Sequence, residues 1–132
     1  MRYTFRKNER LCSKKLIEQL FSSGKSFLTY PVKVTYWLQD NPSSPPAQVL
    51  ILVSRKRFRK AFRRNRIKRL LREAYRLEKH QFYNYLNNVQ KNCLIAISYV
   101  ADNELSLDEI RKSIQTSLQK ICDNDASKNS MA

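Results

Sequence analysis

Apolar residues recur at helical spacing in three stretches of the chain, about 14–23, about 61–80 and from 107 onward. Ser13 stands in the N-cap position before the first stretch, and Gly24, the only glycine, follows it. A glycine there suits the left-handed conformation that often ends a helix. Ser106 and Glu109 precede the third stretch with the spacing of a capping box. The residues predicted to face the core in these two outer helices are Leu16, Ile17, Leu20, Phe21, Leu107, Ile110, Ile114, Leu118 and Ile121.

The segments 27–38, 47–54 and 92–100 are rich in β-branched and aromatic residues, which is typical of strands. Pro31 lies in the first of these segments, and a proline there indicates an edge strand, a bulge or the start of the paired region. The second is apolar on both faces, which predicts a central strand, and turn residues fill the intervening 39–46. Side chains alternate between the two sides of a strand, which gives each of the first two strands two faces. One face carries Val32, Val34, Tyr36, Val49, Ile51 and Val53, and the other carries Lys33, Thr35, Trp37, Leu50, Leu52 and Ser54.

This order of helices and strands predicts an α+β fold, a sandwich with helices packed on a small central sheet. At 132 residues, with 42% hydrophobic residues, the chain is expected to form one domain with an ordinary core. We expect a single domain over 1–122, with a basic arm at 1–12, and a polar, flexible tail over 123–132.

No segment approaches the ~18 consecutive apolar residues of a membrane span, and the N-terminus lacks the apolar region of a signal peptide. The three cysteines, Cys12, Cys93 and Cys122, have neither a zinc-site spacing nor an even number for pairing. Reduced thiols in a cytoplasmic protein are therefore expected.

The distribution of charge along the chain is the strongest indication of function. Residues 55–79 hold thirteen Lys or Arg and two acids, which accounts for +11 of the chain's net charge of +15. Segment 55–60 is predicted to be a loop, and the helix that follows has Ile67, Leu70, Leu71, Ala74, Tyr75 and Leu77 within about 80° of one direction. The opposite, solvent-facing arc carries Asn65, Lys68, Arg69, Arg72, Arg76 and Lys79, with Arg63, Arg64 and Arg66 in the first turn.

Like charges four residues apart destabilise a helix, and cations in its first turn oppose the helix dipole. A polyanion along this face would reverse the sign of both effects, and the planar guanidinium suits bidentate contacts to phosphate. Too few acids stand nearby in the sequence to neutralise the block. The pattern therefore favours a nucleic-acid partner. A membrane surface is the weaker alternative, because the apolar stripe is needed to cover the sheet and only Phe58 and Phe62 flank the block as interfacial anchors.

Two further motifs are not assigned a function. Gly24-Lys25-Ser26 resembles the end of a P-loop, but Gln19 stands where that motif requires glycine. Asp102, Glu104, Asp108 and Glu109 could hold a metal ion, but acids are also common at a helix N-terminus for dipole reasons. No metal site is assigned to the protein, and no catalytic residue either, because His80 is the only histidine and has no nucleophile beside it.

The run from Arg64 to Tyr75, RNRIKRLLREAY, resembles the signature of the bacterial ribonuclease P protein subunit. Val53-Ser54-Arg55-Lys56 and Phe21-Ser22-Ser23-Gly24 are similar to flanking parts of that family. About 6–121 fits its αβββαβα order. The resemblance implies a two-layer sandwich, ribosomal protein S5 domain 2-like, in a subunit of an endoribonuclease that removes the 5′ leader of precursor tRNA.

The partners that the resemblance implies are the catalytic RNA subunit and precursor tRNA, with no DNA and no membrane. The chemistry would rest with the RNA, which would also bind most of the Mg²⁺ cofactor. Carried onto this chain and its basic block, the RNA-binding residues are Arg55, Lys56, Arg57, Arg63, Arg64, Asn65, Arg66, Lys68, Arg69, Arg72 and Arg76.

The family also holds the single-stranded leader in a cleft between the first helix and the sheet, where aromatic groups stack on bases and cations follow the backbone. The corresponding lining here is Ile17, Phe21, Lys33, Thr35, Trp37 and Ser54. The chain departs from the family at Ile17 and Thr35, where many relatives carry aromatics, and at Leu50 and Leu52, which replace small residues. Trp37 supplies an aromatic on the same strand face.

Three other functions remain open on the residues alone. A structural RNA-binding protein, such as a ribosomal component, would have the same composition. A DNA-binding regulator would place its recognition helix after a short helix and a tight turn, whereas a strand precedes it here. A nuclease acting without RNA would need a carboxylate cluster or a histidine pair.

Overall fold

The computed structural model describes residues 5–130, and its elements follow the predicted order. After a short 3-10 helix η1 (Lys7–Glu9) come α1 (Lys14–Ser23), β1 (Lys25–Thr29), β2 (Val32–Gln39), β3 (Ala47–Val53), α2 (Ala61–Val89), β4 (Asn92–Tyr99) and α3 (Leu107–Ser130). The α+β class and the αβββαβα order are confirmed.

The four strands form one mixed sheet in the order β1-β2-β4-β3. β2 pairs antiparallel with β1 and β4, and β3 pairs parallel with β4. The prediction of a central position for β3 is therefore wrong: β3 is an edge strand, and β4 is central. The outer edge of β3 is covered by the N-terminal arm, where Arg10 bridges Val49 and the Leu11 amide donates to the Val49 carbonyl at 2.9 Å. Both faces of β3 are apolar because Val49 belongs to the main core and Leu50 packs against the cluster of buried residues on the opposite face.

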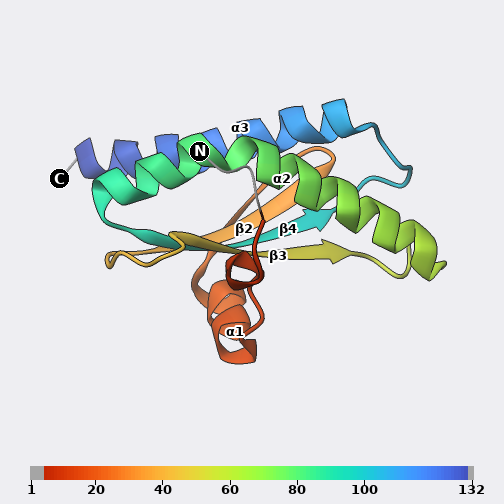
Figure 1. Cartoon of the computed structure of the whole chain (residues 1–132), viewed down its shortest axis with the longest axis horizontal. Coiled ribbons are helices and arrows are strands. Elements are labelled where there is room, and N and C mark those ends of the chain that lie inside the picture. The colour runs from red at the N-terminus through yellow and green to blue at the C-terminus, as the bar shows by residue number, and fades with distance from the viewer. Residues whose placement is uncertain (1–4, 131–132) are drawn as a thin grey trace.

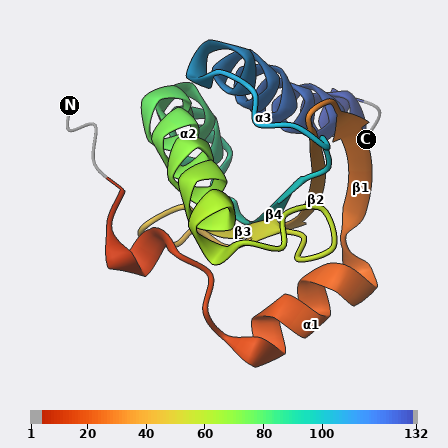
Figure 2. The same ribbon diagram turned by 90° about the vertical axis from the view of Figure 1, so that its right-hand side faces the viewer.

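The helices are divided unequally between the two faces of the sheet. Figures 1 and 2 show α2 and α3 side by side on one face and α1 alone on the other. The α2/α3 face encloses the main core, in which Val32, Val34, Ile95 and Ile97 of the sheet meet buried residues of both helices. A smaller cluster under α1 contains Leu11, Leu20, Leu94 and Ala96. The two-layer description thus holds for α2, α3 and the sheet, and α1 adds a partial third layer.

The stretch predicted as one strand over 27–38 is a hairpin of two strands. Thr29 of β1 faces Val32 of β2 across the turn at Tyr30 and Pro31. Pro31 has no amide hydrogen to donate within a ladder and stands immediately before β2, so the start of the paired region is the predicted position that the structure shows.

Glycine is required at position 24 for a different reason from the one predicted. Its φ is −76° and its ψ is 164°, an extended conformation that any residue adopts. A Cβ at this position would lie 2.4 Å from the Leu20 carbonyl oxygen and 2.8 Å from that of Tyr36. The chain needs glycine here because backbone packs directly against backbone where α1 turns into β1. The left-handed residue of the described chain is Gln90, with φ 58°, at the end of α2.

Both long helices extend beyond their predicted ends. α2 continues past residue 80 to Val89, where Phe82 and Leu86 add to the buried stripe. α3 continues through the expected flexible tail to Ser130. Asp125 explains the second extension, because this buried carboxylate accepts from Tyr85 Oη at 2.5 Å and from Lys91 Nζ at 2.7 Å. Within residues 5–130, no helix has the length and hydropathy to cross a membrane.

Candidate RNA-binding surface

The central part of α2 is anchored by four side chains without solvent exposure, Ile67, Leu71, Ala74 and Tyr75. Leu70 and Leu77, at the margins of the predicted stripe, are half-buried. The apolar face is therefore occupied by the sheet and α3, as the periodicity predicts, and is not available to a membrane.

The opposite face of α2 presents the predicted polar residues. Asn65 and Arg69 are exposed, and Lys68, Arg72 and Arg76 are half-buried. Lys79 is the exception, since only 4% of it is exposed. Its ammonium is paired with Glu9 of the N-terminal arm, so the prediction of a solvent-facing Lys79 is wrong.

The Glu9 side chain is also buried, and its carboxylate accepts hydrogen bonds from several donors. It accepts from the Arg6 amide at 2.6 Å and from Tyr83 Oη at 2.8 Å, besides its pair with Lys79. Burial would raise the pKa of this carboxyl, but the hydrogen bonds from Arg6, Lys79 and Tyr83 lower the pKa overall. The buried pair ties the N-terminal arm to the middle of α2.

Acids from the loop between β4 and α3 partly neutralise the start of the basic block. Asp102 lies 2.9 Å from Arg57, and Glu104 lies 3.6 Å from Arg63 and 3.4 Å from Arg66. The expectation that too few acids stand nearby is therefore wrong at this end, because the fold places residues about forty positions later in the chain beside the block. The same loop acids, considered above as metal ligands, are bound to arginines instead.

Further along α2, fewer of the basic side chains are paired with an acid. Arg76 donates from Nε to Glu73 at 3.0 Å within the same helix turn. Lys68 and Arg69 form no ion pair with any residue that the structure describes, and the same holds for Arg55 and Lys56 in the loop. Uncompensated charge thus lies at two places, the preceding loop and the middle of the outer helix face.

Arg64, the first residue of the RNR run, has a local role. Its Nη1 donates to the carbonyls of Phe58 at 2.9 Å and Arg59 at 2.8 Å. The side chain folds back on the loop that leads into α2, so it fixes that loop while its charge stays at the surface.

Arg10 of the arm is a residue that the sequence interpretation did not assign. It faces Arg72 across a cavity of about 150 Å³ lined by Phe5, Leu11, Cys12, Val49, Leu50 and Ile51. Burial lowers the pKa of Arg72, and repulsion by Arg10 lowers it further. Two cations on apolar walls form a place where an anion is favoured. The basic character of the arm was the available signal, but no spacing rule relates residue 10 to residue 72.

On the α1 side of the sheet, the structure brings most of the predicted leader-binding residues to one face. Lys33, Ser98 and Leu52 form one row across β2, β4 and β3, and Thr35, Ala96 and Leu50 form the next. Ile17 packs onto this face, Phe21 is 49% exposed, and Lys33 is exposed. This face therefore offers apolar and cationic surface beside α1.

Two of the predicted lining residues have other contacts. Thr35 is only 7% exposed, and its Oγ1 lies 2.8 Å from Ser26 Oγ, so the hydroxyl serves the β1–β2 ladder. Ser54 is exposed, and its Oγ accepts from the Lys56 amide at 3.1 Å, which makes it a turn residue at the end of β3. Thr35 is therefore largely covered on this face, and its place in the leader cleft stays a prediction.

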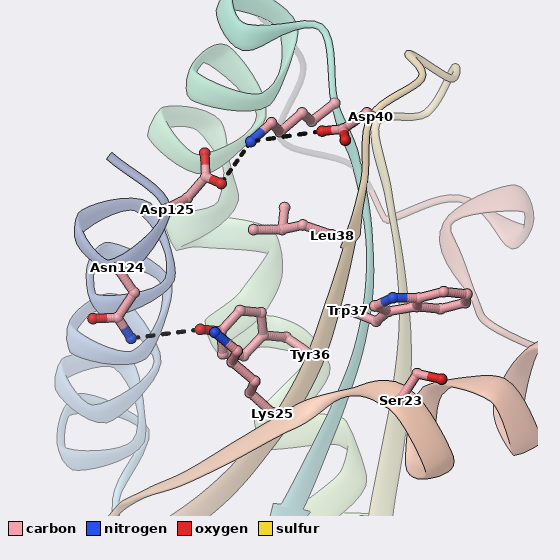
Figure 3. A pocket seen from close by; sticks show the side chains of 9 residues that line it. Ser23, Lys25, Tyr36, Trp37, Leu38, Asp40, Asn124 and Asp125 are labelled. Atoms are coloured by element: carbon pink, nitrogen blue, oxygen red, sulfur yellow. Dashed lines mark hydrogen bonds and ion pairs between the residues drawn. The ribbon is translucent and has the colours of Figure 1, made fainter. Parts of the chain in front are cut away.

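Trp37 lies at a separate pocket of about 390 Å³ at the sheet edge, where β2 extends past β1. Figure 3 shows its ring on the α1 side of β2, with Tyr36 and Leu38 turned toward α3. Lys91 joins Asp125 at 2.7 Å and Asp40 at 3.8 Å, and Asn124 contacts the Tyr36 hydroxyl at 3.5 Å. Trp37 also packs against the smaller cluster under α1, as Ile17 does, and it lies on the same face of β2 as Lys33.

The described residues contain no group of three or more His, Cys, Asp or Glu side chains that could hold a metal ion. His80 is half-buried, and burial together with Lys79 lowers its pKa. Burial raises the pKa of the Cys93 thiol, and that of Cys122 to about 11; no disulfide joins the three cysteines. What the arrangement offers is a rigid cationic surface suited to phosphate groups.

Comparison with known proteins identifies a family. Residues 5–122 match the family described as Ribonuclease P. The ribonuclease P protein component of Porphyromonas gingivalis is 39% identical over 118 residues, which cover 89% of this chain and 86% of the relative. That of Chlorobium phaeobacteroides is 47% identical over 83 residues, covering 61% and 57%.

Solved structures share the fold at lower identity. The ribonuclease P protein from Thermotoga maritima superposes with a TM-score of 0.65 at 24% identity, covering 85% of this chain and 96% of that one. A Staphylococcus aureus RNase P protein mutant with defective mRNA degradation activity gives 0.66 at 19% identity, covering 87% and 89%. The match over nearly the whole chain, together with the RNR run at the start of α2, shows that the chain belongs to the ribonuclease P protein family.

Proposed function

We propose that this protein binds the catalytic RNA subunit of ribonuclease P and assists removal of the 5′ leader from precursor tRNA. The observation that carries the proposal is the outer face of α2, where Lys68 and Arg69 have no acidic partner among residues 5–130. Asn65 and Arg72 flank them on the same helix face. A helix anchored by fully buried side chains holds these groups in fixed positions toward a phosphate backbone.

The share of the protein is binding rather than bond cleavage. The described residues offer neither a metal-binding cluster nor a histidine pair, and Asp102 and Glu104 are bound to arginines. We place the Mg²⁺ of the reaction mainly with the RNA partner, and the lack of such a cluster within residues 5–130 supports this. The protein neutralises phosphates and orients the substrate.

For the leader, the supporting surface is the open part of the α1 face. Lys33 is exposed there, in one row with Ser98 and Leu52, and Phe21 is half exposed at the end of α1. An unpaired strand can stack a base on the Phe21 ring while Lys33 meets its backbone. The Thr35 hydroxyl lies 2.8 Å from that of Ser26, so the proposal relies on Phe21 and Lys33 for this contact.

The decisive experiment reconstitutes the full chain with its cognate catalytic RNA and measures precursor-tRNA cleavage at low magnesium, with and without protein. We expect the protein to increase cleavage strongly and the RNA-free protein to cleave nothing. Absence of stimulation would contradict the assignment, and cleavage by RNA-free protein would establish a nuclease that acts alone. Sequencing the RNA recovered with the protein from cells separates this function from a ribosomal role.

A further inference from the structure

The loop that leads into α2 borders an open hollow of about 340 Å³. This volume lies near the lower end of the range of ligand pockets, about 300–1,000 Å³. The lining combines five cations with one aromatic ring: Lys56, Arg57, Arg59, Lys60, Arg63 and Phe62. The hollow is separate from the outer α2 face and from the surface beside α1.

The charge in this hollow is only partly compensated. Arg57 pairs with Asp102 and Arg63 with Glu104. Lys56, Arg59 and Lys60 have no ion pair with any residue in the described part of the chain. Three positive charges around one concave surface favour an anionic ligand.

The exposed ring of Phe62 indicates which class of anionic ligand the hollow would bind. The ring is 57% exposed in the first turn of α2, whereas Phe58, four residues earlier, is 1% exposed and packs against Tyr99. Phe58 therefore serves the core and Phe62 does not. The Lys60 and Arg66 cations lie 5.9 Å and 5.7 Å from the Phe62 ring centroid, near the ~6 Å limit of a cation–π contact. Such long contacts leave the ring available to a better stacking partner.

The loop around the hollow is held in place from within. The Phe58 amide donates to the Ser54 carbonyl at 3.1 Å, and the Lys56 amide to Ser54 Oγ at 3.1 Å. Arg64 binds the Phe58 and Arg59 carbonyls. Because the backbone is fixed in this way, a ligand would meet a preformed site and lose little affinity to loop ordering.

We propose that this hollow binds one unpaired nucleotide of an RNA strand, with its base stacked on Phe62 and its phosphates among Lys56, Arg59 and Lys60. The inference rests on the RNA binding proposed above and adds a site that prefers single-stranded RNA. Bases inside a duplex already stack on their neighbours, so an exposed ring can reach only an unpaired base. Stacking on an aromatic side chain contributes roughly 5- to 150-fold in affinity per base.

The test compares two probes on the full chain, a single-stranded ten-residue oligouridylate and a blunt RNA duplex with no unpaired residue. Phe62→Leu should weaken binding of the single strand by roughly 5- to 150-fold and leave duplex binding unchanged. Phe62→Tyr keeps the ring and should stay within about threefold of the wild type. Tyr30→Leu removes an exposed aromatic outside the hollow and should have no effect. Circular dichroism verifies that each variant is folded.

Unchanged single-strand affinity in Phe62→Leu, or an equal loss on both probes, overturns the proposal. A second readout is independent of that variant: with Trp37→Phe as background, a Phe62→Trp chain carries one tryptophan, whose emission the single strand should quench and the duplex should not. Equal or absent quenching also overturns it. Wild-type stimulation of precursor-tRNA cleavage, measured beside these assays, shows separately whether the proposed function stands.

Discussion

Individual cations of the basic block differ in what surrounds them. Arg57, Arg63 and Arg66 lie against loop acids, and Arg76 lies against Glu73. Exposed ion pairs of this kind contribute little to stability, but they reduce the charge offered to an RNA. A residue's position on the helix face therefore does not by itself show whether its charge is compensated.

Arg69→Ala should weaken binding of the catalytic RNA by ~1–3 kcal/mol, because it removes an uncompensated charge from the outer face of α2. Arg76→Ala is the matched control on the same helix, and its loss of affinity should be smaller because Glu73 already offsets that charge. Filter binding at fixed salt measures both variants, and melting temperatures should stay at the wild-type value. An equal loss in the two variants would contradict this ranking.

Gly24→Ala should destabilise the fold by ~1–3 kcal/mol or more, since the added carbon would meet two backbone carbonyl oxygens. Gly24→Asn distinguishes the close approach from a left-handed backbone, because asparagine tolerates the latter but clashes here as alanine does. Urea unfolding measures both, with the exposed Ser23→Ala as control. If Asn were tolerated much better than Ala, the close approach would not be the reason for this glycine.

At the scale of elements, the N-terminal arm and α2 form one unit. The Glu9–Lys79 pair, buried and seventy residues apart in sequence, holds the arm against the helix, and Arg10 is thereby placed opposite Arg72. The arm also covers the edge of β3. We infer that the arm's docking sets the positive surface at this end of the molecule.

Glu9→Gln should destabilise the protein by ~3–5 kcal/mol near neutral pH, because Lys79 would remain buried without its counter-charge. The lowered pKa of Glu9 also predicts a pH dependence. A carboxyl with a lowered pKa stabilises the fold above its unfolded value, near 4.5, and this contribution is lost as the pH falls through the folded value.

Urea unfolding at about pH 7 and about pH 3.5 tests both parts. The wild type should lose stability between these pH values, and Glu9→Gln should lose less. The double variant Glu9→Gln with Lys79→Met should recover much of the loss at neutral pH, since no charge is then buried. An equally acid-sensitive Glu9→Gln would contradict the role given to this carboxylate.

At the scale of the whole molecule, the sheet separates two regions of different character. Figure 2 shows the basic helix α2 beside α3 on one side and α1 on the other. In the function proposed above, an RNA bound along α2 would leave the α1 face free for the leader strand. The net charge of +15 adds a long-range attraction that draws both to the protein.

Binding to the catalytic RNA should depend steeply on salt. If about six phosphates are neutralised by the block, the logarithm of the binding constant should fall against the logarithm of salt concentration with a slope of roughly −4 to −5. Titrations at a series of potassium chloride concentrations give the slope, and Arg69→Ala should make it shallower by about one. A slope near zero would exclude phosphate neutralisation as the main source of affinity.

Local patterns in the sequence determined most of the elements and their order, although they did not divide 27–38 into β1 and β2. Helical spacing predicted the buried stripe of α2, and β-branched runs predicted β2, β3 and β4, because these signals depend on neighbours a few positions apart. The cap at Ser13, where the Leu16 amide donates to Oγ at 3.3 Å, is of the same local kind. The RNR run, also a local pattern, indicated the family.

Only the tertiary structure decided which residues at distant positions meet. The burial of Lys79, the acids beside Arg57 and Arg66, the edge position of β3 and the clash that requires Gly24 all depend on contacts between separate elements. No periodicity within a helix carries that information, because a charge pattern is the same whether its partner is an RNA, a loop acid or a buried carboxylate. The sequence therefore established a basic amphipathic helix, and the fold decided which of its charges remain available to RNA.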